Sequence, residues 1–463
     1  MGKNNKLFGE EKIGKLLLRF SIPIIISFLV SELYNMVDTL FVGRNVGAYG
    51  IGGLVLVFPI QRIIIALSVM IAVGASTAFS RSNGQNNFDE SRKIVRNGFS
   101  LSILLMISIT AIIYIFSEKI LLSLGASHQI LPYAKTYLDI IIFGSTFLTL
   151  TTFISNIMIS VGNNKVSIIS TSIGAIINII LDYILVLELK MGVKGAAIAT
   201  TVSQVIGFTY AYYHYSKIKK EFKIPSGFEL DKKIIIPIIL VGLSAFIVES
   251  EDGILMAVRN HLLVNTAGDG GIVVLGVISK VYMFLFITMF GIASAMQPIA
   301  AFNVGAKNYN RLKTVMQKTT IYAVLTTSIL WVMAMIFTPQ LMAIFVKDPE
   351  IIRESVKAFR IVVAGFPVVS MYYVSIFYFQ ALGKAKTSIF LSISKQLILT
   401  IPVSIILVKG FNLGAMGVWL AYPISDILAS IASYMLIKEE SYKLNIKIEK
   451  AREARGTVPF ASH

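Results

Sequence analysis

The sequence contains no cysteine and little charge, and both absences narrow the class of protein. Without cysteine, the 463-residue chain can form neither a disulfide nor a thiolate metal site. Only 14% of its residues are charged, whereas 55% are hydrophobic and the mean hydropathy is +0.76. A soluble domain of this size could not carry so many apolar residues on its surface. The sequence therefore predicts an integral membrane protein.

Signatures of enzymes and of metal centres are also missing. The chain has no Gly-x-x-x-x-Gly-Lys-Ser/Thr phosphate loop, so we do not expect it to hydrolyse ATP by itself. It has no zinc motif, nucleophile elbow or paired catalytic acids, and its four histidines lack ligand spacing. We therefore predict a protein that is not an enzyme, with no cofactor and no metal beyond a coupling cation.

Long apolar runs recur along the chain. A spanning helix needs roughly 20 predominantly apolar residues. The first run is too long for a cleaved signal peptide, and no small-residue cleavage site follows it. We predict an all-α membrane protein of about twelve transmembrane helices, at residues 15–42, 50–79, 94–117, 130–160, 166–188, 194–216, 234–264, 270–301, 317–345, 355–381, 387–408 and 414–437.

Lysine and arginine gather in every second loop, and this predicts the orientation. Short loops rich in these residues remain cytoplasmic. Such clusters precede the first helix, follow the second and eighth, and fill the central loop and the tail. Both termini are therefore expected in the cytoplasm, in a bacterial inner membrane. The same distribution, with attraction to anionic lipid, accounts for the net charge of +17, so no nucleic-acid partner is expected.

An internal repeat organises the chain. The segment SVGNNKVSI at residues 160–168 matches ALGKAKTSI at 381–389, an offset of 221. With an offset that is one residue longer, MGVKGA at 191–196 matches LGAMGV at 413–418. The sequence therefore predicts six helices twice.

Six spans in each half give the two repeats the same orientation, related by an axis along the membrane normal. Two six-helix bundles around a central cavity suit alternating access. We predict an N-terminal lobe at residues 1–216, a cytoplasmic inter-lobe loop at 217–233, a C-terminal lobe at 234–437 and a cytoplasmic tail at 438–463.

Acids within the spans of the first half predict an ion site, because intramembrane charges are costly. Asp38 lies late in the first span, Asp182 late in the fifth and Thr200 early in the sixth, so all three fall in the extracellular half of the membrane. Asn178 lies one turn before Asp182 on the same helical face. A hard cation takes several such oxygens. A proton needs only one carboxyl group, and burial disfavours ionisation of both acids together. The site therefore suits either Na⁺ or H⁺.

The second half does not repeat this set of residues. By the same offsets, Asp38 corresponds to Arg259, Asn178 to Leu399, Asp182 to Val403 and Thr200 to Tyr422. If these polar residues served only the fold, their counterparts would be expected to match. The alternative for Asp182 is an acid at a helix end, satisfied by interfacial water.

Four segments carry a family resemblance, namely LYNMVDTLFVG at residues 33–43, NIILD at 178–182, GAAIAT at 195–200 and ALG at 381–383. With these segments the chain resembles MATE (multidrug and toxic compound extrusion) transporters along nearly its whole length. The resemblance implies antiport of organic, often cationic compounds out of the cell. Its implied ion-coupling residues are Asp38, Asn178, Asp182, Thr200 and Ala196, with Tyr137 as a hydrogen-bond partner, and Pro23 matches a proline at which the first helix bends.

Further polar or adaptable residues are candidates for a substrate cavity. Three acids in four residues, Glu249, Glu251 and Asp252, depart from the family's pattern. Gln297 lies beside a proline within a span, where a polar group needs a reason. Met289 belongs to an apolar stripe that is more typical of packing. Asn35, three residues before Asp38, is the last candidate.

A flippase for a lipid-linked saccharide is the alternative function. Such proteins share a related helical plan but usually have more spans and a cationic cavity, whereas the first half here is acidic inside. We expect small organic cations or drugs and the lipid bilayer as partners, and a monomer. The sequence leaves the physiological substrate, the coupling ion and the stoichiometry open.

Overall fold

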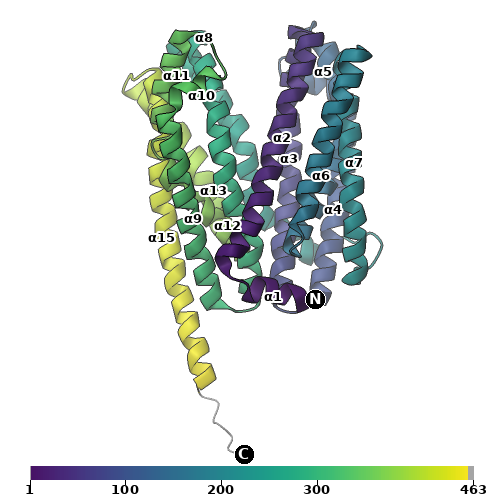
Figure 1. Ribbon diagram of the computed structural model, residues 1–463, viewed down its shortest axis with the longest axis vertical. Coiled ribbons are helices and arrows are strands. Elements are labelled where there is room, and N and C mark those ends of the chain that lie inside the picture. The colour runs from purple at the N-terminus through teal and green to yellow at the C-terminus, as the bar shows by residue number, and fades with distance from the viewer. Residues whose placement is uncertain (1, 457–463) are drawn as a thin grey trace, which may run out of the picture. The chain divides into compact units, whose positions relative to one another are not determined.

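The computed structural model describes residues 2–456, apart from the side chains of residues 2–5, 34, 35, 39, 44, 48, 251–254, 452 and 454–456. Every regular element in this part of the chain is helical (Figure 1). The elements of the first half are α1 (Gly2–Glu10), α2 (Ile13–Asn45), α3 (Ala48–Gly84), α4 (Phe88–Ser123), α5 (Leu131–Ser160), α6 (Asn164–Asp182), the π-helical η1 (Tyr183–Glu188) and α7 (Gly192–Glu221).

The second half begins within a long helix and ends in another. Its elements are α8 (Lys232–Gly305), α9 (Tyr309–Ile336), α10 (Thr338–Ala343), α11 (Pro349–Val362), α12 (Phe366–Ala381), α13 (Ala385–Ile393), the π-helical η2 (Ser394–Thr400), α14 (Ile401–Ile405), the π-helical η3 (Ile406–Gly410) and α15 (Ala415–Gly456).

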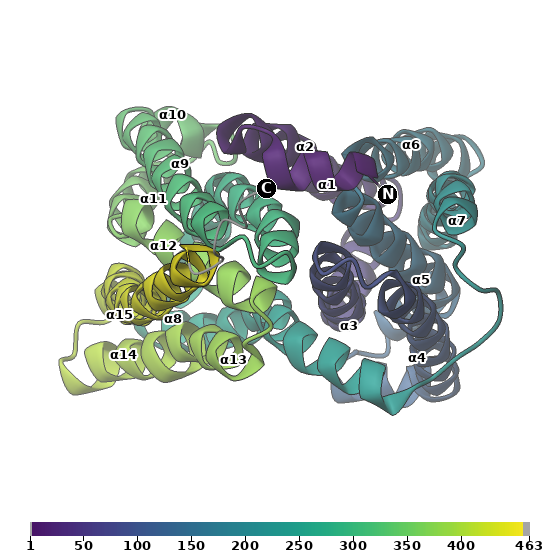
Figure 2. The ribbon, with the colours of Figure 1, turned by 90° about the horizontal axis from the view of Figure 1, so that it is seen from below.

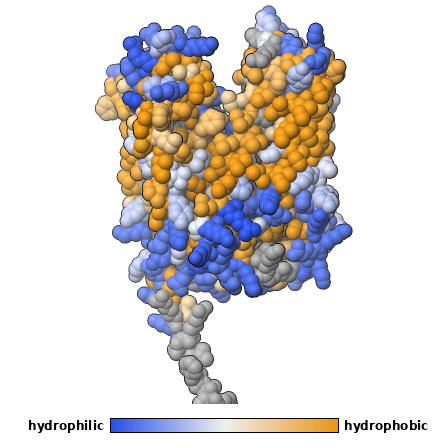
Figure 3. Space-filling model, in the orientation of Figure 1, coloured by the Kyte–Doolittle hydropathy of each residue, from blue (hydrophilic) through white to orange (hydrophobic). Residues whose placement is uncertain are grey.

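These helices account for the twelve predicted spans. Nine helices within the described residues are long and apolar enough to cross a membrane, and the bent pair of α11 and α12 makes a tenth. Helix α8, with 74 residues, covers two predicted spans, and α7 covers the predicted sixth. On the face that Figure 3 shows, apolar side chains cover the middle of the helices and hydrophilic ones gather toward their ends. The all-α membrane fold is confirmed.

Three predicted spans differ in form from the structure. The span predicted at 355–381 is broken between α11 and α12, which meet at an angle of 53°. Gly365 lies at this break, and a Cβ there would meet Cβ of Asp426 at 2.9 Å. The spans predicted at 234–264 and 270–301 join without a loop in α8, where only Gly268 has non-helical angles (φ 60°, ψ −155°). Glycine adopts a positive φ without the Cβ penalty, which lets the chain turn there.

The chain divides into two compact units. The first comprises Ile22–Ser82 and Asn87–Gly253, and the second comprises Gly2–Ser21, Asn83–Asn86 and Ile254 onward. In the second unit, Asn303 Nδ2 donates to the carbonyl of Phe8 at 3.2 Å, which fixes α1 against the end of α8. The lobe boundaries predicted at residues 216 and 234 concern the repeat and stay a prediction.

In the first unit, α4, α5, α6 and α7 lie side by side, with α5 between α4 and α7 (Figures 1 and 2). One of its apolar cores includes Val42 of α2, Leu138 of α5 and Ala197 of α7. In the second unit, α12 packs against α9 and α15. These packed bundles hold the polar residues described below inside the protein.

The backbone repeats with the sequence. Asn86 and Lys307, 221 residues apart, are both non-glycine residues with positive φ (58° and 53°). Each precedes an asparagine cap: Asn87 accepts a bond from the amide of Glu90, and Asn308 accepts one from the amide of Arg311. The π-helical η1 likewise recurs as η3, and each is followed by a positive-φ glycine at position 192 or 414. The internal duplication is therefore confirmed in three dimensions.

Candidate cation site

Asp38 lies inside the first unit and is contacted by two other helices. Its side chain comes from α2 and is 4% exposed. Oδ2 accepts a hydrogen bond from the hydroxyl of Tyr137 on α5 at 3.2 Å and one from Thr200 Oγ1 on α7 at 3.4 Å. Both donors are themselves buried. The carboxylate is thus held between three helices.

Asn178 and Asp182 add the polar face of α6 to the same place. Both are fully buried and lie one helical turn apart. Asn178 Nδ2 donates to Thr200 Oγ1 at 3.3 Å, so Thr200 links Asn178 to Asp38. The carboxyl groups of Asp38 and Asp182 also lie close enough to share a hydrogen bond when one is protonated. The four predicted side chains therefore meet.

The end of α6 brings Asp182 to this position. Asp182 is the last α-helical residue, and the π-helical η1 follows it directly. Gly195 at the start of α7 packs against η1, since a Cβ there would meet the carbonyl oxygen of Leu185 at 2.9 Å. Asn45 Nδ2 of α2 donates to the carbonyl of Val186 in η1. A π-helical turn widens a helix locally and often accompanies a functional site.

The site has more acceptors than donors. Among the described residues, none donates a hydrogen bond to Oδ1 of Asp38, to Oδ1 of Asn178 or to either carboxylate oxygen of Asp182, although all four atoms are buried. A buried acceptor without a partner costs roughly 1–3 kcal/mol. Oxygen atoms gathered in this way are the ligands of hard cations, and a shared proton would also satisfy them. The residues present fit either a cation or a proton.

The remaining predicted member, Ala196, is fully buried in α7 one turn before Thr200. It belongs to the same apolar core as Tyr137. Its expected role as a carbonyl ligand stays a prediction. The described residues contain no cluster of three or more His, Asp or Glu side chains of the kind that holds a transition metal.

Comparisons with known proteins give the family. The family model described as MatE matches residues 23–184 and 254–406. The chain belongs to the MatE family. Proteins of this family are transporters, and the chain is therefore a multi-pass membrane transporter and not an enzyme.

Similar proteins cover nearly the whole chain. The multidrug export protein MepA of Staphylococcus haemolyticus is 23% identical over 446 residues, which are 96% of this chain and 97% of the relative. A FAD transporter of Shewanella oneidensis is 23% identical over 92% of this chain and 94% of its own length. A solved crystal structure of MATE in complex with MaL6 has a TM-score of 0.90 at 23% identity, and covers 96% of this chain and 99% of that one. This last match shows the shared fold.

The predicted cavity residues of this MATE chain whose side chains are described belong to different units. Glu249 is half-buried in the first unit. Gln297 lies in the second unit, where its Nε2 donates to Gln380 Oε1 at 2.6 Å. Met289 is fully buried, as expected for packing. The side chains predicted at Asn35, Glu251 and Asp252 lie outside the described residues.

Pro23 lies inside α2, which continues as a helix past it. Ser27 Oγ donates to the carbonyl of Pro23 at 2.8 Å. Proline removes one intrahelical hydrogen bond, which weakens α2 at this turn. The bend expected there stays a prediction.

Sequence reasoning missed a buried ion pair in the second unit. Lys395 Nζ lies 2.9 Å from Asp426 Oδ1, and the two side chains are 5% and 2% exposed. The signal was present, because Lys395 and Asp426 both interrupt apolar spans, at 387–408 and 414–437. Like Asp38, both residues are charged groups within predicted spans, which are costly and therefore indicate a functional role.

Proposed function

We propose that this MATE chain is a secondary active exporter that moves organic compounds out of the cell in exchange for the entry of Na⁺ or H⁺. The observation that carries the proposal is the buried pair of Asp38 and Asp182, with three carboxylate oxygens that accept no hydrogen bond from described residues. Two buried carboxylates require a positive charge, a proton or a metal cation, to compensate them. A charge that enters and leaves there couples the site to an ion gradient.

The basic loops support the proposed direction of transport. With both termini in the cytoplasm, Asp38 and Asp182 fall in the extracellular half of the membrane. A cation from outside then reaches the site over a short path, and its release inward supplies energy for export by alternating access. We propose that the protein takes this orientation in the bacterial inner membrane.

The substrate class is supported by the relatives. One similar protein is named for multidrug export and another for FAD transport. We propose small organic compounds, cations among them, as the substrates of this chain. A parallel transport measurement with FAD distinguishes a dinucleotide substrate from an organic cation.

Transport by purified protein in liposomes tests the proposal. Export of a fluorescent organic cation is measured under an imposed Na⁺ gradient and, separately, an imposed pH gradient. The unmutated protein is compared with Asp182→Asn, which keeps the shape of the side chain but removes its charge. Asp139→Asn is the matched control, because Asp139 lies in the same unit and is paired with Lys135 at 2.8 Å.

We expect one gradient to drive export by the unmutated protein and by Asp139→Asn, and Asp182→Asn to lose it while remaining folded. Export by Asp182→Asn at the unmutated rate would contradict the ion-coupling role. Folded protein that moves neither FAD nor the cation under either gradient would favour the flippase for a lipid-linked saccharide.

A further inference from the structure

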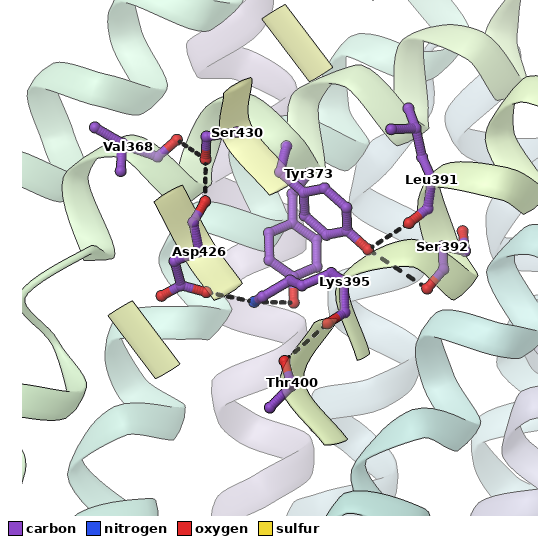
Figure 4. A network of polar contacts seen from close by, with 9 residues as sticks. Val368, Tyr373, Leu391, Ser392, Lys395, Thr400, Asp426 and Ser430 are labelled. Carbon is purple, nitrogen blue, oxygen red and sulfur yellow. Dashed lines mark hydrogen bonds and ion pairs between the residues drawn. The ribbon is translucent and has the colours of Figure 1, made fainter. Parts of the chain in front are cut away.

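The ion pair of Lys395 and Asp426 is the most deeply buried ion pair among the described residues, and the proposed cation site does not use it. Lys395 comes from η2 and Asp426 from α15, and their charged ends point toward one another (Figure 4). Removing two charges from water costs several kcal/mol per ion, which mutual attraction repays only with good geometry. A buried pair of this kind contributes little net stability, which favours a role for it other than stabilising the fold.

The surroundings of the lysine ammonium are those of a cation-binding site. The ring centroids of Tyr373 and Tyr372 lie 5.0 and 5.5 Å from Lys395 Nζ. Nζ also donates to the Tyr373 hydroxyl at 3.4 Å. Aromatic rings around an ammonium, completed by a carboxylate, recognise alkylammonium and quaternary ammonium ligands. Here the occupant is a side chain of the protein itself.

Both rings are held in place independently of Lys395. The Tyr372 hydroxyl donates to the carbonyl of Leu391 at 2.9 Å. The ring of Tyr373 packs edge-to-face against Tyr372, with centroids 4.9 Å apart, and against Phe286, at 5.2 Å. The rings would therefore keep their positions if the lysine side chain moved away. The cation-binding surface is preorganised.

Lys395 lies in a segment that is suited to moving. The π-helical η2 precedes Pro402, which has no amide hydrogen to continue the helical ladder. Thr400 Oγ1 donates to the backbone carbonyl of Lys395 at 2.8 Å and so gives this carbonyl a hydrogen-bond partner within the π-helical turn. A π-helical turn differs from an α-helical one by a single residue of register, so a small change re-aims its side chains.

Asp426 has capacity for another donor. Its residue is 1% exposed, and Oδ2 accepts no hydrogen bond from any described residue. The second cation that acts on this carboxylate is Arg259, whose guanidinium lies over the ring of Tyr422 at 3.9 Å. When the Lys395 side chain moves away, Arg259 therefore still compensates part of the negative charge of Asp426.

We propose that Tyr372, Tyr373 and Asp426, together the aromatic–carboxylate box, bind the ammonium group of an organic cation, and that Lys395 is a tethered occupant which such a ligand displaces. This inference rests on the proposed function only for its physiological meaning, because binding needs no ion gradient. The box then gives the second unit a substrate site of its own. Lys395 acts there as an internal competitor, which keeps the carboxylate compensated when no ligand is bound.

Chemical complementation in the full-length protein tests whether the box accepts a free ammonium. Thermal unfolding is measured in detergent for the unmutated protein, Lys395→Ala, and the double variant Lys395→Ala with Asp426→Asn, each with n-butylammonium chloride or with sodium chloride. We expect n-butylammonium to raise the unfolding temperature of Lys395→Ala alone. An equal response of all three proteins, or a response to sodium chloride of the same size, would overturn the proposal.

Equilibrium binding of ethidium, followed by fluorescence polarisation, tests the competition. Removal of the competitor in Lys395→Met should tighten the dissociation constant by about tenfold, or about 1.4 kcal/mol. Asp426→Asn should weaken it. Equal or weaker binding by folded Lys395→Met would contradict the inference.

Separate measurements keep this inference distinct from the proposed function. Ethidium binding by Lys395→Met tests the box, whereas the loss of gradient-driven export in Asp182→Asn tests only the proposed function. If the unmutated protein exports but Lys395→Met binds ethidium no differently from it, the proposed aromatic–carboxylate box is wrong. The proposed export function is then still supported by the transport result.

Discussion

Arg259 lies over the ring of Tyr422, 3.9 Å from its centroid, at the two positions that correspond in the repeat to Asp38 and Thr200. In the first unit, Thr200 donates to the carboxylate of Asp38 at 3.4 Å. The same two helical positions therefore meet in both units. In the first unit a hydroxyl contacts a carboxylate there, whereas in the second a guanidinium lies over an aromatic ring. The duplicated scaffold is kept while the sign of the charge is reversed.

This reversal predicts that ion dependence is confined to the first unit. Asp38→Asn should abolish the dependence of export on the driving cation, because it removes a carboxylate from the oxygen-rich site. Arg259→Gln, the repeat-matched control, should leave the half-maximal concentration of the driving cation unchanged, whatever its effect on substrate affinity. Cation titrations of proteoliposome export measure both. A shifted half-maximal concentration in Arg259→Gln would show that the second unit takes part in ion binding.

Tyr137→Phe should weaken the site without destroying it. The variant removes one hydroxyl, which donates to Asp38 Oδ2 at 3.2 Å. A hydrogen bond to a charged group contributes roughly 1.5–3 kcal/mol. We therefore expect the half-maximal concentration of the driving cation to rise by about tenfold or more. The control is Tyr133→Phe, one turn earlier in α5, which should behave like the unmutated protein. Equal effects of the two variants would assign the loss to packing.

Thr200 should tolerate serine but not valine. Its Oγ1 donates to Asp38 and accepts from Asn178, so one hydroxyl joins two side chains. Valine has nearly the same shape but leaves a buried amide and a carboxylate oxygen each short of a partner, at roughly 1–3 kcal/mol for each group. Gradient-driven export should fall at least tenfold in Thr200→Val and persist in Thr200→Ser. Comparable export by both variants would exclude the hydroxyl from the site.

The absence of cysteine makes the predicted orientation directly testable. Lys223 in the central loop and Lys190 between η1 and α7 are both exposed. Single-cysteine variants Lys223→Cys and Lys190→Cys should react with a membrane-impermeant maleimide from opposite sides. In intact cells we expect labelling of Lys190→Cys alone, and in inverted vesicles labelling of Lys223→Cys alone. Labelling of both from one side would overturn the assignment of the termini to the cytoplasm.

The sequence was sufficient for the spans and the repeat because both depend on signals summed over many residues. The meeting of Asp38, Asn178, Asp182 and Thr200 also followed from their depth and helical spacing, and the structure brings their side chains together. Their role as an ion-coupling site stays a prediction. Helix geometry predicts where these side chains lie, but whether an ion binds them depends on the affinity of the site.

Local irregularities were beyond the hydropathy pattern. The break between α11 and α12 arises where Gly365 packs against Pro423 and Asp426 of α15. The turn in α8 depends on the positive φ of one glycine, Gly268. Such features are decided by tertiary contacts that a window average does not contain. The pair of Lys395 and Asp426 was missed for a similar reason, since one charged residue changes the average hydropathy of a strongly apolar span only slightly.

The crossing of α3 and α8 in the first unit depends on glycine, which predicts a large loss of stability in Gly242→Ala. A Cβ at this position would meet the carbonyl oxygen of Met70 at 1.9 Å, and backbone cannot yield as a flexible side chain does. We expect Gly242→Ala to lose more than about 2 kcal/mol, by the overpacking that such insertions cause. Gly276→Ala is the matched control in the same helix, because a Cβ there meets nothing within 4 Å. Alanine favours a helix by about 1 kcal/mol over glycine, so this control should be neutral or stabilised. Thermal unfolding in detergent measures both, and a loss of stability of similar size in the two variants would show that the close approach to α3 does not decide the result.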